Sequence, residues 1–132
     1  MIKKLQEIAK KAYVPYSKFR VAALFELENG DFFEGFNIEN AAYPNSLCAE
    51  RVAIVSAINA GIDVTQVKNI HIFSPESKDF LSPCGGCRQS MSEFISQETN
   101  IWMYNNNGEY IKESFSTLFP YCVDPKNIKG EK

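Results

Sequence analysis

The sequence predicts a single α/β domain of three layers, in which a mixed sheet of about five strands is covered by helices on both faces. The chain has 132 residues, enough for one compact domain with a core but too few for two of ordinary size. Apolar residues make up 45% of it and charged residues 23%, as in ordinary globular proteins. Helical and strand-like apolar patterns follow one another without an internal repeat. One domain spanning 1–132 is therefore expected.

The first half of the chain shows the pattern of a helix, a hairpin and a second helix. Apolar residues recur at helical spacing from 2 to 12, which predicts an amphipathic helix that is ended by Pro15. Two runs of strand character, 20–27 and 31–37, flank an Asn-Gly pair, which is a strong hairpin signal. A buried helix is expected over 47–60, closed by a glycine that tolerates left-handed backbone.

The second half alternates strands and a helix. A short strand is expected over 67–73, a helix over 82–96 and another strand over 100–104. An Asn-Asn-Gly turn then leads into a short last strand. The tail is aromatic and apolar as far as Val123 and polar after it, so we expect 124–132 to be flexible.

Charge and hydropathy exclude two classes of partner. The formal net charge is -2 and no run of Lys or Arg is present, whereas proteins that bind nucleic acid generally need a basic surface. No apolar stretch approaches the roughly 20 residues of a membrane-spanning helix, and the start of the chain lacks the core of a signal peptide. We therefore expect a cytoplasmic protein that binds neither nucleic acid nor membrane.

The spacing of the cysteines indicates a metal site. Cys84 and Cys87 are separated by two residues, a pattern that alone fits structural zinc, a redox pair or chance. Two further features make it specific: Pro83 precedes the pair, and Cys48 lies upstream at the start of the other predicted helix, two residues before Glu50. The expected ligands of one zinc ion per chain are therefore Cys48, Cys84 and Cys87.

Helix geometry explains why thiolates would form there. With Ser82 as the predicted helix cap and Pro83 as the first helical residue, Cys84 and Cys87 fall in the first turn and share one face. Free N–H groups and the positive end of the helix dipole favour the thiolate form. Three protein ligands on a tetrahedral ion leave one position for water, as in catalytic zinc sites. Glu50 is then the expected proton carrier, acting as a base and not as a ligand.

Three thiolates on one zinc ion leave the site with a formal charge of about -1, which opposes ionisation of a water there. Positive charge nearby would offset it. Arg51 and Arg88 directly follow Glu50 and Cys87, and we expect both to contact the sulfur atoms.

These motifs resemble the signature of the zinc-dependent cytidine deaminase family, in its small homotetrameric type with three cysteine ligands. The resemblance rests on Cys48-Ala49-Glu50-Arg51 and on Pro83-Cys84-Gly85-Gly86-Cys87-Arg88-Gln89. It extends to Tyr16-Ser17-Lys18-Phe19, to Asn37-Ile38-Glu39-Asn40-Ala41-Ala42-Tyr43 and to Leu118-Phe119-Pro120, and so covers nearly the whole chain. It implies a cytidine deaminase-like fold.

The resemblance also implies roles for individual residues. Asn37 and Glu39 match residues that hydrogen-bond the ribose 3'-hydroxyl, and Phe19 matches an aromatic that stacks on the pyrimidine. The backbone of Ala49 matches the group that holds the base carbonyl. Asn40 and Tyr43, in the same matched stretch, complete the expected substrate-binding set.

The implied reaction is hydrolysis of the C–N bond of a cyclic amidine. Cytidine and 2'-deoxycytidine would give uridine and 2'-deoxyuridine plus ammonia, as in pyrimidine salvage, with Glu50 shuttling the proton. A homotetramer with shared active sites is implied as well. Two positions depart from the family pattern: Ala22 stands where glycine is frequent, and Val123 stands where a final aromatic covers the substrate of another subunit, so that Phe119, Tyr121 or no residue replaces it.

Other interpretations remain open at this point. A nucleoside-like substrate such as blasticidin S fits the same zinc site. Cys122 could complete a structural site of four cysteines in a non-catalytic module. An editing deaminase for polynucleotides would need a basic groove and usually a histidine at the position of Cys48. His71, Trp102 and Met103 are expected to be strand and core residues.

Overall fold

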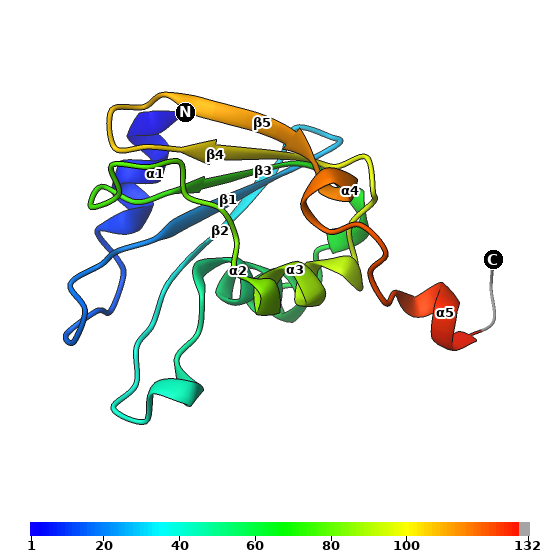
Figure 1. Ribbon diagram of the computed structural model, residues 1–132, viewed down its shortest axis with the longest axis horizontal. Helices are drawn as coiled ribbons and strands as arrows, with labels where there is room; N and C mark the ends of the chain where they lie inside the picture. The colour runs from blue at the N-terminus through cyan, green and yellow to red at the C-terminus, as the bar shows by residue number, and fades with distance from the viewer. Residues whose placement is uncertain (130–132) are drawn as a thin grey trace.

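A five-stranded mixed sheet forms the centre of the computed structural model, which describes residues 1–129 (Figure 1). The strands lie in the order β2-β1-β3-β4-β5, and only the β3–β4 pair is parallel. This confirms the predicted α/β class. The strands are β1 (Ala22–Leu27), β2 (Phe32–Phe36), β3 (Val67–Phe73), β4 (Asn100–Tyr104) and β5 (Tyr110–Ser114). The helices are α1 (Ile2–Ala9), α2 (Ala49–Asn59), α3 (Gly85–Ser92), α4 (Phe115–Leu118) and α5 (Pro125–Lys129), with short 3-10 turns η1 (Tyr43–Asn45) and η2 (Val64–Gln66).

The predicted hairpin is formed by β1 and β2, which pair antiparallel with Phe25 opposite Phe33. Gly30 has a φ of 92°, as the tight connection between the two strands requires. The strand from Val67 to Phe73 and the strand from Asn100 to Tyr104 have the predicted bounds. Gly61 follows α2 with a φ of 79°, so the predicted helix end is confirmed.

The first helix is shorter than its apolar pattern suggests. It ends at Ala9, because Tyr13 is drawn into a short parallel bridge with Ile38: Tyr13 N donates to the carbonyl of Asn37 at 3.0 Å, and Glu39 N donates to the carbonyl of Tyr13 at 2.8 Å. Backbone groups used across the sheet edge in this way are not available to continue a helix. The bridge brings the segment after α1 alongside the segment after β2.

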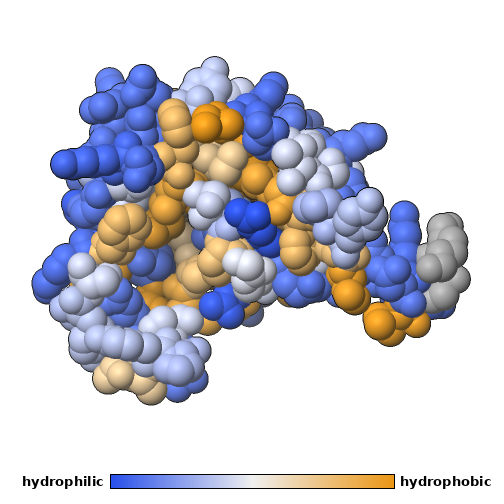
Figure 2. Space-filling view, in the orientation of Figure 1, coloured by the Kyte–Doolittle hydropathy of each residue, from blue (hydrophilic) through white to orange (hydrophobic). Residues whose placement is uncertain are grey.

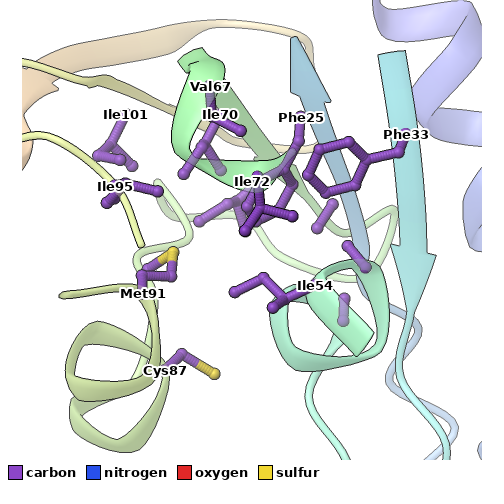
Figure 3. Packing of buried hydrophobic residues seen from close by; sticks show 14 of the residues in the cluster. Phe25, Phe33, Ile54, Val67, Ile70, Ile72, Cys87, Met91, Ile95 and Ile101 are labelled. Carbon is purple, nitrogen blue, oxygen red and sulfur yellow. The ribbon is translucent and has the colours of Figure 1, made fainter. Parts of the chain in front are cut away.

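The sheet separates two apolar clusters. α1 covers one face through Leu5, Ile8 and Ala9. α2 and α3 cover the opposite face, which carries the larger cluster. Figure 3 shows Ile54 of α2 and Met91 of α3 turned toward the sheet residues of this larger cluster. Val67 and Ile101 belong to it as well, and both are buried. Because successive side chains of a strand point to opposite faces, the strands contribute residues to both apolar clusters.

Gly35 allows α2 to lie directly against β2. A Cβ atom at this position would stand 2.2 Å from the carbonyl oxygen of Ala49 and 2.4 Å from the backbone N of Ala53. Backbone atoms cannot move out of the way as a flexible side chain could. The first turn of α2 is therefore packed against the sheet without an intervening side chain.

The chain ends in α5, which projects from the rest of the molecule in Figure 1 and has no buried residue. The expected flexibility of 124–132 stays a prediction, since 130–132 lie outside the described residues. Among the residues that the structure describes, no helix combines the length and the apolar character needed to cross a membrane.

His71, the only histidine of the sequence, lies in β3 as expected and is 4% exposed. Its Nδ1 lies 2.8 Å from the hydroxyl oxygen of Tyr104, while within residues 1–129 its Nε2 has no hydrogen-bond partner. Burial lowers the pKa of His71 from 6.5 to about 4. The unfolded chain therefore binds a proton at pH values where the folded chain does not.

This difference sets a pH dependence of stability. Because the folded pKa lies below the unfolded one, the free energy of unfolding should be full above pH 6.5 and fall as the pH drops toward 4. Between pH 7 and pH 5 we expect His71 to contribute a loss of about 2 kcal/mol. Chemical unfolding of wild type and His71→Asn at both pH values measures this, and the loss should be smaller by that amount in the variant. Equal losses would show that His71 does not titrate in this range.

Candidate active site

The N-termini of α2 and α3 meet on the face of the sheet that carries the larger apolar cluster, and the N-cap of each helix is a cysteine. Cys48 is the N-cap of α2, at the helix entrance as predicted. It is held there by a small antiparallel bridge in which Ile38 and Leu47 exchange both backbone hydrogen bonds, at 3.0 and 2.9 Å. The chain therefore enters α2 in a fixed position.

The start of α3 differs from the prediction. Ser82 was expected to cap the helix and Pro83 to open it, but the N-cap is Cys84 and the helix begins at Gly85. The Cys84 sulfur accepts a hydrogen bond from the backbone N of Cys87 at 3.4 Å, and so does the work expected of the serine oxygen. The helix also ends at Ser92, earlier than expected.

The three predicted ligands come together. The sulfur atoms of Cys48, Cys84 and Cys87 all lie within 4.8 Å of one another, and those of Cys48 and Cys84 are 3.8 Å apart. Two sulfurs bound to one tetrahedral zinc ion at about 2.3 Å would be separated by about 3.8 Å. The cluster therefore fits zinc, with one ion per chain. Cys122 lies elsewhere, with its sulfur 3.5 Å from Nε2 of Gln97.

Hydrogen bonds within the cysteine cluster favour the thiolate form of Cys48. The thiol of Cys87 hydrogen-bonds the sulfur of Cys48, and chiefly for this reason the pKa of Cys48 is lowered to about 5. Arg51 and Cys84 lower it further. The same bond, together with burial, raises the pKa of Cys87. The thiolate form is thus favoured at Cys48, whereas the thiol of Cys87 loses its proton only when a metal ion binds.

The two arginines act differently from each other. Nη2 of Arg51 lies 3.9 Å from the sulfur of Cys48, and the thiolate raises the pKa of Arg51. Arg88 instead donates from Nε to the carbonyl of Pro83 at 2.8 Å and from Nη1 to the carbonyl of Leu118 at 2.6 Å. The expected hydrogen bond of Arg88 to sulfur is not among these. Arg88 fixes the residue before Cys84 and attaches the C-terminal segment to it.

Glu50 lies beside the cluster in the first turn of α2 and is 3% exposed. Burial raises the pKa of its carboxyl to about 7, and the negative charge of Cys48 adds to the effect. A carboxyl with a pKa in this range can both accept and return a proton near neutral pH. This is the behaviour of a general acid–base group.

A cavity of about 490 Å³ opens above Glu50. This volume lies within the range of small-molecule binding sites. Figure 2 shows apolar side chains gathered around a hollow between the sheet and the α2–α3 layer, next to a few strongly polar residues. The residues predicted from the sequence that line the cavity are Asn37, Glu39, Tyr43, Cys48, Ala49, Glu50 and Cys84.

Glu39 is bound to the segment that follows α1. Its Oε1 accepts from the backbone N of Tyr16 at 3.0 Å and from that of Ser17 at 3.1 Å, and its Oε2 accepts from the Ser17 hydroxyl. These bonds lower the pKa of Glu39. The sequence analysis assigned no role to Ser17, although it follows Tyr16 in the Tyr16–Phe19 motif and both residues line the cavity.

Asn37 holds the next part of the same segment. Its Oδ1 accepts from Val21 N at 2.8 Å and its Nδ2 donates to the carbonyl of Phe19 at 2.9 Å. Phe19 and Asn40 are not among the cavity-lining residues of the described chain. The backbone N of Asn40 donates to the Ser46 hydroxyl at 3.0 Å, and its Oδ1 accepts from Ala42 N at 2.8 Å, so Asn40 shapes the loop before Cys48.

Comparison with known proteins gives one consistent result. The model of the cytidine and deoxycytidylate deaminase zinc-binding region matches residues 1–103. The chain is 39% identical over 118 residues to cytidine deaminase of Mycoplasma genitalium, which covers 89% of this chain and 88% of that protein. It is 35% identical to cytidine deaminase of Sporosarcina psychrophila, with 97% and 92% covered. The crystal structure of cytidine deaminase from Burkholderia pseudomallei matches with a TM-score of 0.86 at 34% identity, covering 92% of this chain and 95% of that one.

Removal of one sulfur should release the metal. In Cys84→Ser we expect zinc affinity to fall by more than about 100-fold. Loss of a residue that only hydrogen-bonds a metal ligand already lowers metal affinity by about 10- to 100-fold, and loss of a ligand should cost more. The melting temperature should fall as well, because metal binding and folding are linked. Cys122→Ser is the matched control and should keep one zinc per chain. Metal analysis of the dialysed proteins measures both, and equal zinc in the two variants would contradict the assigned ligand set.

Proposed function

The chain belongs to the cytidine and deoxycytidylate deaminase family, and from this premise we propose that it hydrolyses cytidine and 2'-deoxycytidine to uridine and 2'-deoxyuridine plus ammonia. The observation that supports this most directly is the buried Glu50 carboxyl beside a three-thiol cluster at the base of a cavity. We further propose that the enzyme serves pyrimidine salvage in the cytoplasm.

Cys48, Cys84 and Cys87 would hold the zinc ion. When bound, zinc acts as a Lewis acid and lowers the pKa of a water molecule, so that a nucleophile forms at neutral pH. The N-termini of α2 and α3 and the guanidinium of Arg51 place positive charge around the three sulfurs. This charge offsets the negative charge that three thiolates bring.

Glu50 would move both protons of the reaction. It takes a proton from the attacking water and delivers it to ring N3 as the water oxygen bonds to C4. It then carries the remaining hydroxyl proton to the amino nitrogen, the C4–N bond breaks, and ammonia leaves. The products are the uridine nucleoside and ammonia, with water consumed. A pKa of about 7 lets one carboxyl perform both transfers.

The nucleoside would be recognised by the groups around the cavity mouth. Asn37 spends one N–H and one lone pair on the backbone of Phe19 and Val21, which leaves a second N–H for the ribose 3'-hydroxyl. Glu39 already accepts three hydrogen bonds and keeps one lone pair, on Oε2, for the same hydroxyl. We assign the backbone of Ala49 to the base carbonyl, and Phe19, Asn40 and Tyr43 to the walls of the site.

A homotetramer with shared active sites is part of the proposal. α2 exposes Val55 and Ile58, at 63% and 49%, and Tyr43 at the cavity mouth is 67% exposed. Apolar side chains on one helix face favour association. In the C-terminal segment Tyr121 is fully exposed with a φ of 55°, and it is a candidate to replace the aromatic missing at Val123.

Light scattering tests the assembly. Wild type should have about four times the chain mass of 14.9 kDa, whereas Val55→Glu, which buries a charge in the proposed interface, should give smaller species with lower activity. Val55→Ala should remain associated. A monomeric wild type with full activity would refute the assembly and leave the proposed reaction untouched.

Glu50→Gln tests the reaction itself. We expect it to keep one zinc per chain while kcat for cytidine falls by about 100- to 10,000-fold, because the proton carrier is lost and the ligands are not. The fall in ultraviolet absorbance as cytidine becomes uridine measures turnover, and a chelator should abolish it in the wild type. Glu7→Gln, on the exposed side of α1, should behave as wild type.

Competition separates the alternative substrates. Cytidine, 2'-deoxycytidine and blasticidin S are offered at equal concentration to the wild type. Faster turnover of blasticidin S than of either nucleoside would overturn the substrate assignment. A zinc-loaded protein without turnover of any of the three would support a non-catalytic module.

A further inference from the structure

The segment from Phe19 to Val21 belongs to no helix or strand, and its last residue, Val21, lines the cavity of the proposed nucleoside site. One backbone bond, from Asn37 N to the Val21 carbonyl at 3.3 Å, and four hydrogen bonds with side chains hold it in position. The side-chain bonds are Phe19 N to the Ser17 hydroxyl at 3.0 Å, Asn37 Nδ2 to the Phe19 carbonyl at 2.9 Å, Arg20 N to Glu76 Oε2 at 2.9 Å and Val21 N to Asn37 Oδ1 at 2.8 Å. Ser17 and Asn37 are already part of the proposed site, whereas Glu76 is not.

Glu76 binds both the main chain and the side chain of Arg20. Besides the bond to Arg20 N, its Oε1 accepts from Nε at 3.1 Å and from Nη2 at 2.5 Å. The two side chains are 39% and 29% exposed, so the pair adds little to the stability of the whole fold. Each group also shifts the other's pKa toward the charged form. We call this pair the Arg20–Glu76 clasp.

Glu76 lies in the connection from β3 to α3, which forms another side of the same cavity. Farther along this connection Leu81, Ser82 and Cys84 line the cavity. The connection is itself anchored: Glu76 N donates to the buried Ser74 hydroxyl at 3.1 Å, and Leu81 N donates to the Tyr104 carbonyl at 3.1 Å. The clasp therefore joins a segment that lacks regular structure to one that is fixed on the sheet.

We propose that the Arg20–Glu76 clasp positions the Phe19–Val21 segment for nucleoside binding, and that Glu76 is a positioning residue for substrate affinity. This rests on the proposed function. Glu76 acts on the segment through its bond to Arg20 N, and Arg20 acts only by holding the Glu76 carboxylate in place. The clasp touches neither the cysteine cluster nor Glu50, so it affects binding of the substrate and leaves the chemical step unchanged.

Steady-state kinetics with cytidine tests the clasp. In Glu76→Ala we expect KM to rise by about five- to tenfold, the effect of losing roughly one hydrogen bond of ordinary strength because solvent screens the exposed carboxylate, with kcat within about twofold of wild type and one zinc per chain. Glu76→Gln retains an acceptor for Arg20 N and should recover most of the affinity. Arg20→Ala in the Glu76→Ala background should add nothing, because its side chain acts through the carboxylate.

A matched ion pair provides the control. Lys11 and Glu34 are 2.7 Å apart and somewhat more exposed than the clasp, and they join the turn after α1 to β2 without lining the cavity. Glu34→Ala should therefore leave KM unchanged. The clasp's role is refuted if Glu76→Ala keeps the KM of wild type, if Glu34→Ala raises KM equally, or if Glu76→Ala loses kcat or zinc. No turnover of cytidine by the wild type would refute the proposed function, and the clasp's role with it, whereas normal wild-type turnover with an unchanged KM in Glu76→Ala would refute the clasp alone.

Discussion

The close contact between β2 and the first turn of α2 is the constraint on which the site depends. Because Gly35 carries no side chain, the backbone of α2 lies directly on the strand, and the helix cannot shift without leaving a gap in the larger apolar cluster. Ala49 and Ala53 are completely buried by this contact, and Glu50 is carried into the interior with them. The raised pKa of Glu50 follows from that burial. A packing requirement of the sheet therefore determines the protonation chemistry of the site.

Sulfur atoms at two helix N-termini make the metal cluster electrostatically feasible. The free N–H groups of a helix start favour negative charge, and here α2 and α3 direct two such starts at the same cluster. Cys84 caps its own helix, so a metal ligand and a local folding signal are one atom. Folding of α3 and formation of the metal site are for this reason parts of the same process.

The sequence was sufficient where a signal is local. Two strands have their predicted bounds, and the cysteines that come together are the three expected from spacing. The sequence was insufficient where contacts outside the local pattern set the ends of a helix. A bridge between Tyr13 and Ile38 shortens the first helix, and the sulfur of Cys84 caps α3 in place of Ser82. The same holds for Glu76, which lies 56 positions from its partner Arg20 and in no motif. Such a contact depends on the packing of two loops and leaves no periodic or spacing signal.

The groups to which we assign catalysis and those to which we assign recognition rest on different kinds of structure. Glu50 and the cysteines are held by helix starts packed on the sheet, which resist local opening. The Phe19–Val21 segment is held by a few side-chain hydrogen bonds and one backbone bond, and it belongs to no helix or strand. Under the proposed function we therefore expect substitutions in that segment to change nucleoside affinity without displacing Glu50 or the cysteines. Substitutions at Gly35 or Cys84 cannot do so, because there folding and chemistry depend on the same atoms.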